Sequence, residues 1–157
     1  MSSPRQREYL ESKINTASAP KLHLMLIDGA LRFGREAEKA LMRDDADAAS
    51  EPLLRAIRIL GEMIVGVRDG ESEVNQKLLQ VYQFIYHRMT TVYVSGDLQH
   101  IAEVLKILEF EQETWRQACE KVASEQEANQ PPKTKPVAPH IADASLTGAE
   151  GSLRLEA

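Results

Sequence analysis

Four long stretches of this sequence repeat apolar residues at steps of three and four, and only short turns separate them. That spacing places the apolar side chains on one side of an α-helix. The turns fall at Asp44, at Asp69–Gly70 and at Ser95–Gly96, and Asp97 is a favourable N-cap for the last helix. Because a chain cannot return to its starting end within a few residues, neighbouring helices run antiparallel. The sequence therefore predicts an all-α fold, an antiparallel up-down four-helix bundle.

Each predicted helix has one main apolar stripe, and the four stripes together form the predicted core. The stripes consist of Leu22, Met25, Leu26, Gly29, Ala30, Phe33, Ala37, Ala40 and Leu41; of Ala49, Leu53, Ala56, Ile57, Leu60, Met63, Ile64 and Val67; of Val74, Leu78, Val81, Tyr82, Ile85, Met89 and Val92; and of Leu98, Ile101, Leu105, Leu108, Trp115, Ala118, Cys119 and Val122. Burying one such stripe per helix is enough to hold a bundle together.

The composition changes sharply after the last helical stretch. Four of the seven prolines fall together at Pro131, Pro132, Pro136 and Pro139, followed by a run rich in small and polar residues. Such a stretch has too little regular apolar spacing to offset the entropy of ordering it. We therefore predict a short N-terminal segment at residues 1–17, the bundle at 18–127 and a disordered Pro-rich tail at 128–157.

The bulk properties narrow the class of function. A chain of 157 residues can build one core without a metal ion or a disulfide. The formal net charge of -5 disfavours an electrostatic nucleic-acid binder. The single cysteine, Cys119, cannot form an internal disulfide, and the sequence has neither a long apolar run nor a signal peptide. We therefore predict a cytoplasmic protein that does not insert into a membrane.

Several helices carry apolar residues outside the main stripe, and this surplus is the main functional clue. The additional residues are Leu24, Ile27 and Leu31 on the first predicted helix, Leu54 and Val65 on the second, Leu79, Phe84, Tyr86 and Tyr93 on the third, and Val104, Ile107 and Phe110 on the fourth. Large exposed apolar patches usually mark partner sites. The alternative is a wide core stripe that buries some of these residues. We predict at least one exposed groove suited to an amphipathic partner helix.

The block from Tyr9 to Phe33 reads YLESKINTASAPKLHLMLIDGALRF. It resembles the N-terminal signature of the FliS family of flagellin chaperones, roughly Y-x-x-x-x-V-x-T-A-S-P-x-x-L-x-x-M-L-Y-D-G-A-I-R-F. The matching positions are Tyr9, Thr16, Ala17, Ser18, Leu22, Met25, Leu26, Asp28, Gly29, Ala30, Arg32 and Phe33, with Ile14 as a conservative replacement for valine. Two positions depart from the signature, because the proline comes one place later at Pro20 and Ile27 stands where the family has tyrosine. Residues 78–89, Asp97 and Trp115 continue the resemblance more loosely.

The resemblance implies a four-helix bundle that binds the disordered C-terminal segment of flagellin, hides its polymerisation surface and keeps it competent for export. It also implies that Tyr9 and Ile14 cover the client groove until flagellin displaces them. Together with the surplus apolar residues, it gives the predicted partner-binding set of Tyr9, Ile14, Leu24, Ile27, Asp28, Leu31, Leu54, Val65, Leu79, Tyr86 and Ile107. Asp28 is expected either to cap a client backbone or to pair with Arg32 one turn along. The free protein is expected to be a monomer or a weak homodimer, and the flagellar export gate is a candidate further partner.

Catalysis and metal binding find little support in the residue patterns. A di-iron bundle needs several inward carboxylates and two Glu-x-x-His pairs, and only Asp97-x-x-His100 comes close. The sequence also has no Gly-rich phosphate loop and no known nucleophile motif. It therefore predicts neither an enzyme nor a cofactor. The alternative function is that of a helical adaptor or regulator that binds an amphipathic helix of another flagellar protein.

Overall fold

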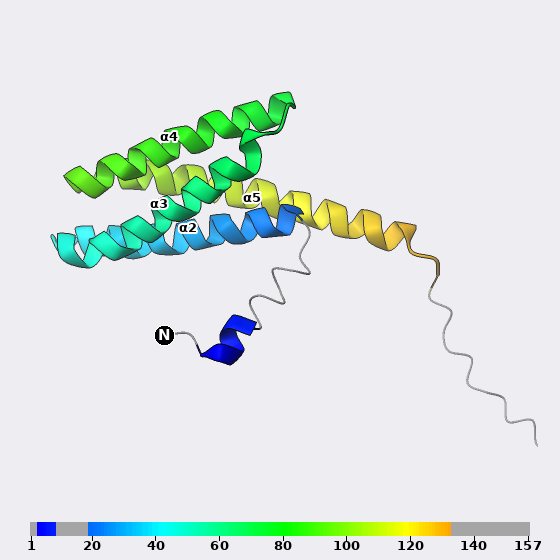
Figure 1. Ribbon diagram of the computed structural model, residues 1–157, viewed down its shortest axis with the longest axis horizontal. Coiled ribbons are helices and arrows are strands. Elements are labelled where there is room, and N and C mark those ends of the chain that lie inside the picture. Colours follow the sequence, from blue (N-terminus) through cyan, green and yellow to red (C-terminus); the bar gives the residue numbers. More distant parts are fainter. Residues whose placement is uncertain (1–2, 9–18, 133–157) are drawn as a thin grey trace, which may run out of the picture.

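The computed structural model describes residues 3–8 and 19–132. Residues 4–8 form a short helix, and four long helices follow: α2 (Ala19–Leu41), α3 (Ala46–Arg68), α4 (Glu73–Ser95) and α5 (Leu98–Asn129) (Figure 1). No strand occurs in this part of the chain, and the prediction of an all-α fold is confirmed. Tyr9, Ile14, and most of the predicted N-terminal segment and tail lie outside the described residues.

Capping interactions fix where the helices begin and end. Asp45 and Ser72 each accept a hydrogen bond from the backbone N–H three residues further on, at 3.0 and 3.1 Å. Asp97 Oδ1 accepts two such bonds, from the N–H groups two and three residues further on, at 2.8 and 3.1 Å. The predicted N-cap at Asp97 is therefore confirmed. Gly96 ends α4 with a φ of 69°, which glycine adopts without steric cost.

The helices pack in a closed order in which each one contacts its neighbours in the sequence and α5 returns to α2 (Figure 1). Two glycines on α2 permit this close packing. A Cβ atom added at Gly34 would lie 2.6 Å from Leu105 Cδ2 on α5. A Cβ atom added at Gly29 would lie 3.1 Å from Ile59 Cδ1 on α3. Glycine inside a helix costs roughly 0.5–1 kcal/mol relative to alanine, and here the close approach of two neighbouring helices offsets that cost.

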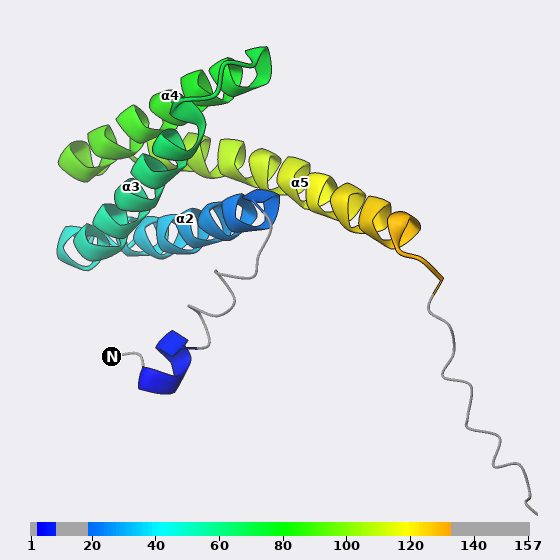
Figure 2. The same cartoon turned by 45° about the vertical axis from the view of Figure 1, so that its right-hand side comes forward.

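α5 is longer than its neighbours. It has 32 residues against 23 in each of the other three long helices, which adds about 14 Å at a rise of 1.5 Å per residue. Figures 1 and 2 show its C-terminal part projecting past the start of α2. None of the described helices is both long enough and apolar enough to span a bilayer.

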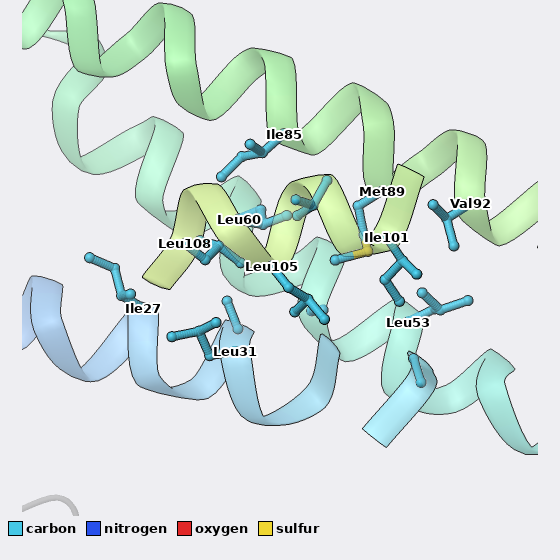
Figure 3. Packing of buried hydrophobic residues seen from close by; sticks show 14 of the residues in the cluster. Ile27, Leu31, Leu53, Leu60, Ile85, Met89, Val92, Ile101, Leu105 and Leu108 are labelled. Atoms are coloured by element: carbon cyan, nitrogen blue, oxygen red, sulfur yellow. The ribbon is translucent and has the colours of Figure 1, made fainter. Parts of the chain in front are cut away.

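The core is one apolar cluster to which all four long helices contribute. Figure 3 shows Ile27 and Leu31 of α2, Leu53 and Leu60 of α3, Ile85, Met89 and Val92 of α4, and Ile101, Leu105 and Leu108 of α5 packed together. Full burial of a side chain of this size contributes about 1.5–3 kcal/mol. One stripe from each helix therefore supplies most of the apolar burial that the fold needs.

The structure corrects the predicted orientation of α2. Ile27 and Leu31 were expected on the surplus face, but both are buried, with exposed fractions of 0% and 1%. Leu22 and Met25 of the predicted core stripe are only half-buried. The buried side of α2 is thus rotated away from the predicted side, roughly by the angle between one residue and the next. α2 is covered by both α3 and α5, and because both of its stripes are apolar, periodicity alone does not select the inner one. Val104 on α5 is likewise buried rather than surplus.

Ile27→Ala is expected to lower the free energy of unfolding by about 2–5 kcal/mol, because it removes buried methyl groups and leaves a cavity. Val65→Ala, at a side chain with an exposed fraction of 50%, is the matched control and is expected to change it by about 0.5 kcal/mol or less. Urea denaturation of the two variants measures both values. Equal losses would show that Ile27 is not a core residue.

Candidate partner-binding surface

The exposed apolar residues of α3 follow one stripe along that helix. Leu54 and Val65 have exposed fractions of 37% and 50%. Arg58 is exposed and Gly61 is half-buried, and with Leu54 and Val65 they share the spacing of one helical face. The stripe covers about three turns, or roughly 16 Å along the axis. This length suits a partner helix with anchors at i, i+3 or i+4, and i+7.

A matching stripe runs along α4. Leu79, Tyr86 and Tyr93 are spaced seven residues apart, and Tyr86 and Tyr93 have exposed fractions of 38% and 43%. The stripes of α3 and α4 meet at Gly61 and Tyr86. Tyr86 Cε2 lies 3.8 Å from the position that a Cβ atom would occupy if residue 61 had one. From that contact Val65 and Leu79 lie toward the turn that joins the two helices.

Leu54 and Tyr93 lie on the other side of the contact, away from the joining turn, where α3 and α4 diverge (Figure 1). We call the combined surface the α3/α4 face. It consists of Leu54, Arg58, Gly61, Val65, Leu79, Tyr86 and Tyr93. Of the predicted partner-binding residues, Leu54 and Val65 lie on the α3 side of this face, and Tyr86 and the half-buried Leu79, which also packs against the core, lie on its α4 side.

The aromatic side chains of α4 point to binding rather than to packing. Tyr82 is the only aromatic residue on this helix that is fully buried, and Phe84, Tyr86 and Tyr93 are exposed by 38–43%. Aromatic rings are large apolar groups that dominate the energetics of cores and interfaces. Tyrosine in particular is enriched among the residues that carry most of the energy of protein interfaces. The arrangement of α4 is therefore typical of a helix that a partner covers.

The other edge of α4, which faces α5, carries fewer apolar residues. Phe84 is exposed by 42%, and the Arg88 guanidinium lies 5.2 Å from the centre of its ring. Across on α5, Ile107 is half-buried and Phe110 is exposed by 72%. Arg88 Nε lies 3.5 Å from Glu103 Oε2, so this edge is interrupted by an ion pair. Ile107 belongs to α5 and lies on this α4/α5 edge, not on the α3/α4 face.

The remaining predicted residues are placed elsewhere. Leu24 is half-buried on α2, and Asp28, one turn along, accepts a hydrogen bond from Gln112 Nε2 of α5 at 2.7 Å. Asp28 thus pairs with Gln112 rather than with Arg32. Ile27 and Leu31 are in the core and offer no surface to a partner.

A buried polar cluster that the sequence patterns did not reveal joins three helices. Trp115 Nε1–H of α5 donates to Tyr82 Oη of α4 at 3.2 Å, and the Tyr82 hydroxyl donates to Glu111 Oε2 of α5 at 3.2 Å. His23 of α2 has its Nε2 atom 2.6 Å from the same hydroxyl oxygen. Because a hydroxyl has one hydrogen, donation to Glu111 requires His23 Nε2 to carry its own hydrogen. The Tyr82 oxygen is then fully paired.

The electrostatics of this cluster follow from burial. His23 has an exposed fraction of 9%, and loss of hydration lowers its pKa from 6.5 to about 4. Burial, reinforced by the negative charge of Glu111, raises the pKa of Tyr82. The His23 ring also lies 4.1 Å from the Trp115 ring, centre to centre. The cluster is therefore neutral at His23 and Tyr82 near pH 7. A lone histidine on an apolar helix and a carboxylate at Glu111 were the signals that could have indicated it.

Asp97 and His100 are the two residues whose sequence spacing comes nearest to that of a metal-binding pair. Their Oδ2 and Nδ1 atoms lie 3.8 Å apart, and Arg88 Nη1 is 2.9 Å from His100 Nε2. Within residues 3–8 and 19–132, no group of three or more His, Cys, Asp or Glu side chains is arranged to hold a metal ion.

Fold and surface together define a helical bundle that has a closed apolar core and, apart from it, an exposed face with aromatic side chains. Such a face is typical of a protein that binds other polypeptides. Comparison with known families agrees with this class. The chain belongs to the FliS family, since the family model described as flagellar protein FliS matches residues 1–122. The resemblance noted in the sequence is thereby confirmed.

Two characterised relatives cover most of the bundle. The flagellar secretion chaperone FliS of Bacillus subtilis (strain 168) is 29% identical over 112 residues, which are 71% of this chain and 84% of the relative. The protein of the same name from Salmonella typhimurium (strain LT2) is 32% identical over 116 residues, 73% of this chain and 86% of the relative. This chain is thus similar to chaperones over nearly their whole length.

The buried histidine makes stability depend on pH. Between pH 6.5 and about 4 the unfolded chain binds a proton at His23 that the folded protein does not bind. The contribution is therefore present above pH 6.5 and is lost as the pH falls toward 4, by at most about 3 kcal/mol.

His23→Gln retains an N–H donor but cannot titrate, so it is the comparison variant for this prediction. Urea denaturation of both proteins across the same pH range separates the histidine from the carboxylates that titrate in both. The wild-type protein is expected to lose more stability than the variant. An identical pH dependence in the two proteins would contradict the assigned role of burial at His23.

Proposed function

We propose that this chain is an export chaperone that binds the C-terminal segment of flagellin in the cytoplasm and keeps it from polymerising before export. The observation that carries the proposal is the α3/α4 face, an exposed apolar and aromatic stripe beside a core that is already complete. Membership of the FliS family and the chaperone names of the two relatives support the same function.

The geometry of the face suits a client that folds as it binds. Ordering a disordered segment costs several kcal/mol, so such interfaces bury about 1,000–3,000 Å². A face about three turns long holds one amphipathic helix, and the client gains its anchors from Leu54, Val65, Tyr86 and Tyr93. Covering these side chains with the apolar residues of flagellin would also hide the client residues that drive polymerisation.

Tyr9 and Ile14 lie outside the described residues, and the proposal keeps them as a cover for the client-binding surface. α2 begins at Ala19, only five residues after Ile14. A short apolar segment tied to the bundle in this way competes at high effective concentration, and the client must displace it. Its release would offset part of the energy of client binding.

Calorimetry with a peptide of about 40 residues from the C-terminus of the cognate flagellin tests the proposal, since such a peptide can bury the area that coupled folding needs. Val65→Asp and Tyr86→Ser are each expected to weaken binding by more than about tenfold, or about 1.4 kcal/mol. Val65→Asp places a charge on the α3/α4 face, and Tyr86→Ser removes an aromatic ring from it. Neither residue belongs to the core.

Met42→Asp is the matched control, because Met42 is exposed by 69% at the end of α2 and lies outside the face. It is expected to bind the peptide as the wild-type protein does. Absence of binding by the wild-type protein, with its fold verified by circular dichroism, would refute the proposed client. Equal weakening by all three variants would show that the α3/α4 face is not the site.

A further inference from the structure

Arg58 lies in the middle of the apolar α3 stripe. It is one turn from Leu54 and one turn from Gly61, and its side chain is exposed. The other two arginines of α3 are paired, Arg55 with Glu51 at 2.5 Å and Arg68 with Asp69 at 3.3 Å. Arg58 forms no ion pair with any residue that the structure describes.

The surroundings of Arg58 hold little negative charge. The only acidic residue of α4 is Glu73 at the start of the helix, and it pairs with Lys77. On α3 the nearest carboxylate along the helix is Glu62, one turn further on, and it makes no ion pair with Arg58. The α4 side of the face presents tyrosine, leucine, glutamine and threonine side chains. Arg58 is therefore the charged residue of the α3/α4 face, whose other members are uncharged and largely apolar, and Glu62 is the carboxylate nearest to it along α3.

A partner that covers this face must also deal with the guanidinium. Burying a charge without a partner is costly, and an acceptor supplied by the incoming segment removes that cost. A carboxylate is the acceptor that matches guanidinium best, because it can take two parallel hydrogen bonds. An apolar segment without one would have to leave Arg58 unpaired or hold it out in solvent.

We propose that Arg58 selects the client, by pairing with an Asp or Glu that lies between two apolar anchors of the bound segment. This inference rests on the proposed function and adds a specificity rule to it. Because Arg58 is one turn from each neighbouring contact on α3, the client carboxylate should lie three or four residues from an apolar residue on either side. Segments that carry lysine or arginine at this position are rejected by like charge.

Calorimetry with the same flagellin peptide tests the inference through Arg58→Gln and Arg58→Glu. Arg58→Gln is expected to weaken binding about tenfold or more, because it leaves the client carboxylate covered and unpaired. Arg58→Glu should weaken it further. Arg55→Glu makes the same change of charge on α3 outside the face, on the side where Arg55 lies over the Phe33 ring of α2, and is the matched control, with an expected effect below about threefold.

A charge reversal identifies the client residue. Each Asp and Glu of the peptide is changed in turn to Lys, and one such change is expected to weaken binding to the wild-type protein and to restore binding to Arg58→Glu. Equal effects of Arg58→Glu and Arg55→Glu, or the absence of any restoring peptide, would overturn the inference.

These outcomes separate the two claims. If Val65→Asp weakens binding and Arg58→Glu does not, the client site stands and the role of Arg58 falls. If the wild-type protein does not bind the peptide at all, both the proposed client and the inference built on it fall.

Discussion

The packing of one apolar stripe from each helix into a single core is the constraint on which the rest of the structure depends. Leu60, Met89 and Leu108 are fully buried, and the glycine at Gly34 lets α2 approach α5 closely enough to close the core. Tyr86 and Tyr93 lie outside this core. Their exposure is therefore available for binding, and a client can attach without disturbing the bundle.

The polar cluster around Tyr82 has a different role from the core. It joins α2, α4 and α5 through one hydroxyl, with His23, Glu111 and Trp115 as partners. Buried polar groups that are fully paired favour one arrangement of the helices, because any other register leaves some of them unpaired. The cluster thus holds α4 in the orientation that points one stripe into the core and leaves the stripe of Tyr86 on the α3/α4 face.

The sequence predicted the helices, their antiparallel order and the cap at Asp97, because apolar spacing and turn residues are local signals. It also indicated that Leu54, Val65 and Tyr86 are surplus to the core. It failed for Ile27 and Leu31, since both sides of α2 are apolar and only contact with α5 decides which one is buried.

The polar cluster escaped prediction for another reason, since His23 and Tyr82 are 59 residues apart and only the fold brings them together. The surroundings of Arg58 are also a property of the assembled surface, because the side chains of α4 that share a face with it are known only once α4 is placed beside α3.

Side-chain methyl NMR during titration with the flagellin peptide tests the central claim most directly. The methyl signals of Leu54, Val65 and Leu79 should shift together while that of Met42 stays fixed, and shifts confined to other surfaces would contradict the assignment of the α3/α4 face as the client site.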